Sequence, residues 1–143
     1  MKAKEYLRQV RKLDKMIKNK LIEKQQWMDV ALSITGQLND EKVKSSGNQQ
    51  RTASAIEKCI DLEREIEEHI DNLIDKKREI LGVIEQLKPD EYDLIHAYYI
   101  QFMTLEDAAY SLGKSYTWAT TVHGRALNSV QAIIDRKANN EEY

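Results

Sequence analysis

Apolar residues that recur three and four positions apart constrain the fold of this chain more than any other feature. The first run begins at Leu7 and continues through Val10 and Ile17 toward Gly36, and a second run covers residues 51–87. Residues at these spacings share one side of an α-helix, and regular alternation of three and four is typical of a coiled coil. The sequence therefore predicts two long amphipathic helices. We expect the first to end near Gly36, because glycine adopts the left-handed conformation that often follows a helix.

Few residues in the chain interrupt a helix, since it holds five glycines and one proline. Charged residues make up 32% and aromatic residues 7%, a composition that suits long helices better than a β-sandwich or barrel. Segment 36–50 is rich in polar turn-forming residues and predicts a loop, which is either a flexible connector or a lid or partner contact. We expect an all-α fold in which a long antiparallel helical hairpin or coiled coil, residues 1–87, precedes a C-terminal helix-turn-helix domain, residues 88–143.

The apolar seam of the second predicted helix is the candidate oligomerisation surface. It consists of Ile56, Cys59, Ile66, Ile70, Leu73, Ile80 and Ile84. Glu63 and Lys77 interrupt the seam, and such polar positions either set the register and number of partners or extend their charged ends out of a loosely packed seam. One hairpin buries only one side of each apolar stripe. The remaining surface predicts a homodimer or a higher even oligomer, most simply a four-helix bundle.

Charge is distributed unevenly along the two helices. Residues 1–36 hold nine Lys and Arg against four Asp and Glu, whereas residues 57–75 hold two against eight. Opposite charges favour pairing of the first helix with the second, within one chain or between chains, although each exposed pair contributes only roughly 0 to 1 kcal/mol. The basic residues of the first helix have a second interpretation, in which they lie along a nucleic-acid backbone. They are Lys2, Lys4, Arg8, Arg11, Lys12, Lys15, Lys18 and Lys20.

Beyond residue 88 the pattern predicts three shorter helices. Pro89 cannot extend the second helix but suits the first turn of the next one. Thr104 is placed to cap a short helix, Gly113 supplies a tight turn, and Ser115 caps the last helix. The inner sides of the last two helices are expected at Leu105, Ala108, Ala109 and Leu112, and at Ala119, Val122, Ala126, Val130 and Ile133.

Four short runs between Thr104 and Leu127 carry a recognisable pattern: TLEDAA, LGKS, ATTV and GRAL. Their order resembles region 4 of bacterial sigma-70-type factors, a DNA-binding helix-turn-helix, and the likeness covers about residues 88–135. Nothing in residues 1–87 resembles the other parts of a sigma factor. A long charged helical region before a single region-4-like end instead resembles the small phage-encoded late transcription regulators of the ArpU/RinA type. The alternative is a pack of three helices that has no role in DNA binding.

The resemblance implies that the last helix enters the major groove of double-stranded DNA. A rotation of about 100° per residue places Thr117, Thr121 and Gly124 opposite the inward face. Threonine can hydrogen-bond base edges or phosphates. Gly124 either permits close approach of DNA or another chain or is an incidental weak point in the helix. The candidate DNA-binding residues are Lys114, Ser115, Tyr116, Thr117, Trp118, Thr120, Thr121, Gly124 and Arg125.

The acidic balance of the C-terminal segment limits the DNA affinity expected from it alone. Residues 89–143 hold four Lys and Arg against eight Asp and Glu, and phosphate contacts require cations. Dimerisation offsets this deficit by coupling two half-sites. The basic first helix is a second source of affinity, and RNA polymerase, a partner that the sigma-factor resemblance implies, is a third.

Other classes of function have little support in the sequence. Cys59 is the only cysteine, His69, His96 and His123 are far apart, and no metal-ligand spacing, cofactor motif or nucleophile motif is visible. No signal peptide or bilayer-spanning run is evident, and a lone thiol suits a reducing cytosol. We therefore expect a cytoplasmic, sequence-specific DNA-binding transcription regulator of phage or prophage origin, and not an enzyme. The alternative is a structural or assembly protein, such as a DNA-packaging adaptor, that uses its helices for oligomerisation.

Overall fold

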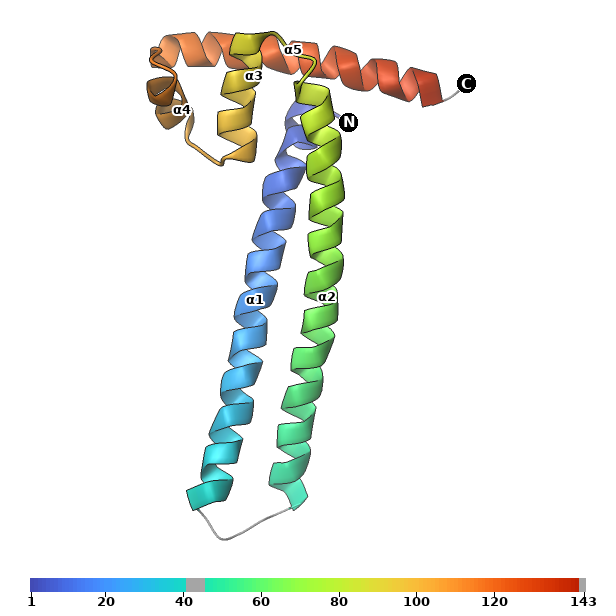
Figure 1. The fold of residues 1–143 in the computed structure, drawn as a ribbon, viewed down its shortest axis with the longest axis vertical. Coiled ribbons are helices and arrows are strands. Elements are labelled where there is room, and N and C mark those ends of the chain that lie inside the picture. Colours follow the sequence, from blue (N-terminus) through green and yellow to red (C-terminus); the bar gives the residue numbers. More distant parts are fainter. Residues whose placement is uncertain (41–45, 142–143) are drawn as a thin grey trace. The chain divides into compact units, whose positions relative to one another are not determined.

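The computed structural model describes residues 1–40 and 46–141, and the side chains of residues 1–33, 47 and 49–141. All regular elements in these ranges are helical, which confirms the predicted all-α class (Figure 1). They are α1 (Ala3–Asp40), α2 (Ser46–Ile84), α3 (Pro89–Ile95), a π-helical turn η1 (His96–Ile100), α4 (Leu105–Ser111) and α5 (Tyr116–Glu141).

The two long helices extend further toward each other than the sequence predicted. Helix α1 passes Gly36 and ends at Asp40, while α2 begins at Ser46 rather than Arg51 and ends at Ile84 rather than Leu87. The predicted loop 36–50 is therefore wrong at both ends, and its residues 41–45 lie outside the described part of the chain. The physical reason is that a single glycine costs a helix only about 1 kcal/mol, which does not stop a long one.

The chain forms two compact units, and each long helix contributes to both. One unit comprises residues 1–12 and 73–143, and the other comprises residues 13–72. The first turns of α1 and the last turns of α2 thus belong to the same unit as the C-terminal helices. The division of the chain into an oligomerisation region and a DNA-binding domain at residue 88 stays a prediction about function.

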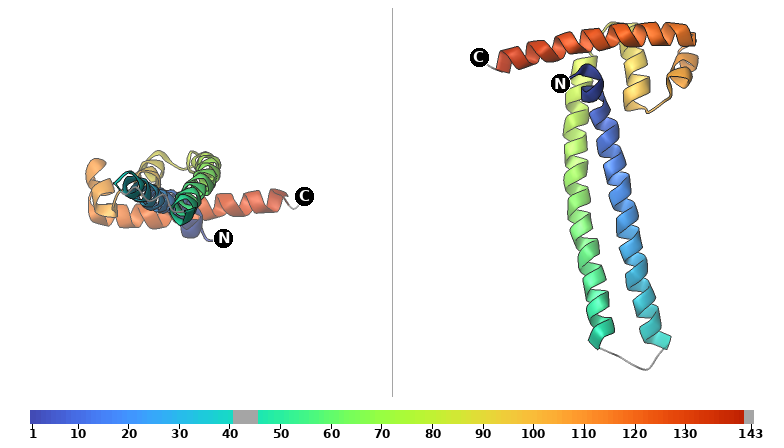
Figure 2. Two further views of the ribbon diagram at one scale, coloured as in Figure 1. Left: turned by 90° about the horizontal axis from the view of Figure 1, so that it is seen from below. Right: turned by 180° about the vertical axis from the view of Figure 1, so that it is seen from behind.

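In the unit of residues 13–72, α1 and α2 run side by side in opposite directions (Figures 1 and 2). Ala55, Leu62 and Ile66 are the buried apolar residues of α2 in this unit, and Cys59 and His69 are half-buried. These positions alternate by four and three. The side of α2 that faces α1 therefore includes 55, 62 and 69 in place of the predicted 56, 63 and 70, while 59 and 66 keep their predicted place, which amounts to a small rotation of the seam.

This rotation changes the role of the two polar residues predicted in the seam. Glu63 and Lys77 are both exposed, so neither interrupts a buried stripe. The Glu63 carboxylate lies 2.8 Å from the Lys24 ammonium of α1, and Glu65 lies 3.0 Å from Lys20. The predicted charge pairing of the two helices is thus confirmed within one chain.

The unit of residues 1–12 and 73–143 contains the main apolar core. Helix α5 lies across the adjacent ends of α1 and α2 (Figure 2), and α3 and η1 pack beside them. Within this unit the ends are joined by hydrogen bonds: the Ala3 amide donates to Gln131 Oε1 at 2.7 Å, and the Tyr6 hydroxyl donates to Glu79 at 2.9 Å. The core residues are Ala3, Tyr6, Leu7, Val10, Ile80, Val83, Ile84, Leu87, Ile95, Tyr99, Ile100, Ala126, Val130 and Ile133.

A second, smaller apolar cluster holds α3, η1, α4 and α5 together. It consists of Leu94, Ala97, Ala108, Ala109, Ala119 and Val122, with Met103, Leu105, Leu112 and Trp118 packed around them. Four of the six buried residues are alanines, whose small side chains let the helices approach closely. This cluster fixes the position of α5 against α4.

Candidate nucleic-acid interface

The caps at the starts of α4 and α5 and the turn between these helices are built as the sequence predicted. Thr104 Oγ1 accepts a hydrogen bond from the Asp107 amide at 3.1 Å, and Ser115 Oγ accepts one from the Trp118 amide at 3.1 Å. Gly113 has a φ of +69°, a backbone conformation that side chains disfavour. The Lys114 amide closes the turn by donating to the Ala109 carbonyl at 2.9 Å. The start of α5 therefore has a defined position relative to α4.

The inner side of α5 is also confirmed, because Ala119, Val122, Ala126, Val130 and Ile133 are all buried. The opposite side, which we call the open side, is exposed to solvent at Thr117, Thr121 and Gly124. Of the candidate DNA-binding residues the structure exposes Lys114, Ser115, Tyr116, Thr117, Thr120, Thr121, Gly124 and Arg125, and half-buries Trp118.

Two threonines on the open side of α5 already use their hydroxyl protons. Thr120 Oγ1 and Thr121 Oγ1 both donate to the Thr117 carbonyl, at 2.9 and 3.0 Å. Each oxygen keeps its lone pairs, so without rearrangement it can only accept a hydrogen bond. Exocyclic amino groups of adenine and cytosine are the base donors that face the major groove. Without rearrangement, Thr121 therefore suits a partner that donates a hydrogen bond, as these amino groups do.

Trp118 and Lys114 pack together at the start of α5. The Lys114 ammonium lies 5.7 Å from the centre of the Trp118 ring, within the range of a cation–π interaction. The charge of Lys114 stays exposed to solvent. It is therefore available to an anion beside the first turn of α5.

His123 points toward η1 and away from the open side of α5. Its Nε2 lies 2.7 Å from the Tyr99 hydroxyl, and its ring stacks on that of Tyr99 at 5.7 Å. Burial lowers the pKa of His123, and the nearby charges of Lys4 and Arg8 lower that pKa further. Burial also raises the pKa of Tyr99 to about 12, helped by Tyr98 and opposed by Arg8. A neutral imidazole can accept the hydrogen bond of the protonated Tyr99 hydroxyl.

The candidate oligomerisation residues differ widely in accessibility. Ile80 and Ile84 are fully buried in the main core, Leu73 packs against it, and Ile66 is buried on α2. Cys59 is half-buried, and only Ile56 and Ile70 of the predicted set are exposed. A second chain would therefore meet a different set of side chains from the predicted seam.

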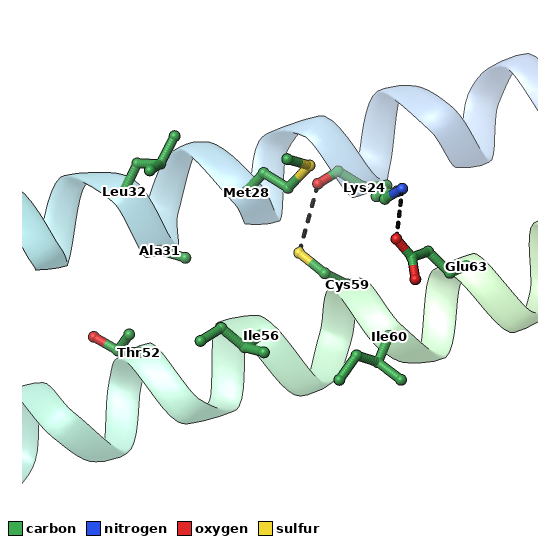
Figure 3. A pocket seen from close by; sticks show the side chains of 9 residues that line it. All are labelled: Lys24, Met28, Ala31, Leu32, Thr52, Ile56, Cys59, Ile60 and Glu63. Carbon is green, nitrogen blue, oxygen red and sulfur yellow. Dashed lines mark hydrogen bonds and ion pairs between the residues drawn. The ribbon is translucent and has the colours of Figure 1, made fainter.

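An open apolar groove lies between α1 and α2 in the unit of residues 13–72 (Figure 3). Met28 and Leu32 line it from α1, and Ile56 and Ile60 line it from α2. The ion pair of Lys24 with Glu63 closes one end, where the Cys59 thiol also donates to the Lys24 carbonyl at 3.9 Å. The groove has a volume of about 430 Å³. Sequence reasoning missed it, because it arises between exposed edges of two stripes.

Comparisons with known proteins add no family to these observations. The chain matches no protein-family model, and neither curated proteins nor solved structures yielded a match. In the described ranges no helix has the length and apolar character that crossing a membrane requires. No group of three or more potential metal-ligating side chains is found among the same residues.

Proposed function

We propose that the protein is a sequence-specific DNA-binding transcription regulator that acts as a dimer. The observation that carries this proposal is the open side of α5. Thr117, Thr121, Gly124 and Arg125 are exposed there, on a helix whose opposite side is buried and whose first turn is capped. A rigid helix with one polar open side suits insertion into the major groove.

The proposal extends to the genetic context and to RNA polymerase through the sequence resemblance alone. The runs TLEDAA, LGKS and GRAL fall on α4, on the turn after it and on α5. A regulator of this kind, encoded by a phage or prophage, binds upstream DNA and contacts RNA polymerase through the same end of the chain.

Selection of bound sequences from a random pool of DNA duplexes tests the proposal. A preferred site should emerge, and Thr117→Ala or Thr121→Ala should then weaken binding to that site by roughly 1 to 3 kcal/mol while random DNA is unaffected. Arg125→Ala should weaken binding to both DNAs alike, because a phosphate contact carries no sequence information. If no sequence is enriched, the protein is not a sequence-specific regulator.

The dimer in this proposal is supported by apolar side chains that the single chain leaves in solvent. In the unit of residues 13–72 these are Leu21, Ile22, Trp27, Met28, Val30, Leu32, Ile56, Ile60 and Ile70. If a second copy packs the same surface against these side chains, the exposed apolar surface of each copy is covered, and the two copies form a four-helix bundle.

Paired substitutions on α2 separate dimerisation from folding. Ile70→Asp should give a folded monomer in light scattering, because Ile70 is 39% exposed in one chain and would be buried only between chains. Leu62→Asp should instead reduce helicity, because Leu62 is buried within one chain, with only 8% of its surface exposed. A wild-type protein that stays monomeric at tens of micromolar would contradict the dimer.

A structural or assembly protein is the second candidate, and the same exposed apolar surface favours it. Such a protein, for example a DNA-packaging adaptor, needs oligomerisation but no preferred DNA sequence. A stable oligomer that enriches no sequence from the random pool would favour this candidate over the regulator.

A further inference from the structure

The basic residues of α1 fall into two groups that the structure treats differently. In the unit of residues 13–72, Lys18 pairs with Asp14, Lys20 with Glu65 and Lys24 with Glu63. Lys2, Lys4, Arg8, Arg11 and Lys12 belong to the other unit, and none of them forms an ion pair with any residue that the structure describes. The second group keeps its charge for an outside partner, as does Lys15, which is exposed and pairs with no acid that the structure describes.

Lys4, Arg8 and Arg11 lie on one side of α1, since they are four and three residues apart. All three are exposed, while Leu7 and Val10 between them point into the core. The Arg11 guanidinium lies 5.6 Å from the centre of the Phe102 ring. A hollow of about 40 Å³ is lined by Arg8 and Arg11 of α1 and by Tyr98 and Tyr99 of η1. It has room for about one water-sized group, such as a phosphate oxygen.

This basic side of α1 adjoins α5. The start of α1 is held on α5 by Gln131, whose side chain accepts from the Ala3 amide and donates to the Met1 carbonyl at 3.1 Å. His123 is half-buried against η1, and the charges of Lys4 and Arg8 lower its pKa after the larger effect of burial.

His123 also links the basic side to the candidate DNA-binding residues. Tyr116, Thr120 and His123 are four and three residues apart on α5, so they share one side of that helix. Tyr116 and Thr120 are exposed. Arg8 and Arg11 line a hollow with Tyr98 and Tyr99, and both tyrosine rings contact His123. These arginines therefore lie near the side of α5 that His123 shares with Thr120.

Residues 1–12 reverse the sign of the net charge of the unit that contains α5. Residues 73–143 hold eight Lys and Arg against eleven Asp and Glu, a net charge of −3, whereas residues 1–12 hold five against one, a net charge of +4. The unit that contains α5 thus carries +1 in total, and its excess of positive charge comes from residues 1–12.

We infer that Lys4, Arg8 and Arg11 at the start of α1 bind the phosphate backbone of the DNA duplex that α5 enters. This inference rests on the proposed function, and it names the source of the non-specific affinity that the acidic C-terminal segment lacks. The partner is a double-stranded nucleic acid, because the cations flank a helix with an open polar side.

The test removes two of these charges from the full-length protein. Lys4→Gln/Arg8→Gln should weaken binding to a random-sequence DNA duplex at least tenfold at low salt. It should also make the plot of log affinity against log salt concentration shallower by about two units, one for each lost phosphate contact. Arg8→Lys keeps the charge and should bind like wild type. Circular dichroism should show unchanged helicity, since both side chains are exposed.

Lys15→Gln/Lys18→Gln is the matched control, because it removes the same net charge from the same helix in the unit of residues 13–72. It should leave the salt dependence unchanged. Equal losses in the two double variants, or wild-type binding by Lys4→Gln/Arg8→Gln, would overturn the inference and leave the proposed function standing. A wild-type protein that binds no duplex even at low salt would overturn both.

Discussion

Gly124 is the residue at which a substitution best separates helix stability from DNA contact. A methyl group at Gly124 would meet nothing within 4 Å, and the same holds for Gly82 on α2. Both lie inside helices, so packing within the chain requires glycine at neither position. Gly124 therefore has no packing role among the residues that the structure describes.

We predict that Gly124→Ala and Gly82→Ala each stabilise the protein by about 1 kcal/mol, because alanine restricts the unfolded chain more than glycine does. Only Gly124→Ala should weaken binding to the selected DNA, by several-fold, if the duplex backbone approaches that point of α5 closely. Thermal denaturation and titration with labelled DNA measure the two effects. Unchanged DNA affinity would make Gly124 an incidental glycine.

His123 gives the folded protein a dependence on pH. Burial and the charges of Lys4 and Arg8 lower the pKa of His123 in the folded chain, so the unfolded chain takes up the proton first. The contribution of His123 to the free energy of unfolding is complete above the ordinary histidine pKa of about 6.5. It is lost as the pH falls through the lower pKa that His123 has in the folded chain. Once protonated at low pH, the imidazole can no longer accept a hydrogen bond from the Tyr99 hydroxyl.

We therefore predict that the free energy of unfolding decreases from pH 7 to pH 5 more steeply in wild type than in His123→Gln, which does not titrate. Urea denaturation at several pH values measures the difference. Carboxylates titrate in both proteins, so the comparison isolates the imidazole. Parallel curves for the two proteins would contradict this role of His123.

At the scale of single elements, α2 carries two adjacent apolar stripes that differ in burial. One stripe includes Leu62 and Ile66 and is buried against α1, while Ile56, Ile60, Ile70 and other residues stay exposed. The buried stripe holds the hairpin together within one chain. The exposed one is available to a second chain.

We predict that Leu62→Ala destabilises the unit of residues 13–72 by roughly 2 kcal/mol or more, the range for truncating a buried leucine. Ile70→Ala, at 39% exposure, should cost less than about 1 kcal/mol when measured on monomers. Thermal denaturation of dilute protein, followed by circular dichroism, compares the two. A larger loss for Ile70→Ala than for Leu62→Ala would mean that the seam of α2 is the stripe predicted from the sequence.

At the scale of the whole molecule, the main core joins segments from both ends of the chain. Leu7 and Val10 of α1 and Ile84 of α2 pack in the same cluster as Ile95 and Val130. A fragment of residues 88–143 keeps only the last two of these five. Its smaller alanine-rich cluster would remain, but its main core would open to solvent.

We predict that residues 88–143 alone do not unfold cooperatively and have lower helicity than the same segment in the full chain. The expected cause is the loss of most partners for Ile95, Tyr99 and Val130, which are all buried in the intact core. Circular dichroism during heating tests this prediction. A sharp transition in the isolated fragment would show that the C-terminal helices fold without α1 and α2.

Local sequence information determined much of the fold. The helical class, the boundary at Pro89, the caps at Thr104 and Ser115 and the inner side of α5 were all predictable. Each depends on residues within one or two turns of each other, where backbone propensity, capping and helical periodicity act. The open side of α5 follows from its inner side by geometry alone.

Only the tertiary structure decided which stripe of α2 faces α1 and which basic residues lie beside α5. Periodicity could not choose between Leu62 and Glu63 as seam positions, because the choice depends on which side of α1 meets them. Charge counts along the sequence could not separate Lys4 and Arg8, which pair with no acid in the described part of the chain, from Lys20 and Lys24, which pair with Glu65 and Glu63 of α2. Both outcomes depend on contacts between residues far apart in the chain, and no local pattern encodes where such residues meet.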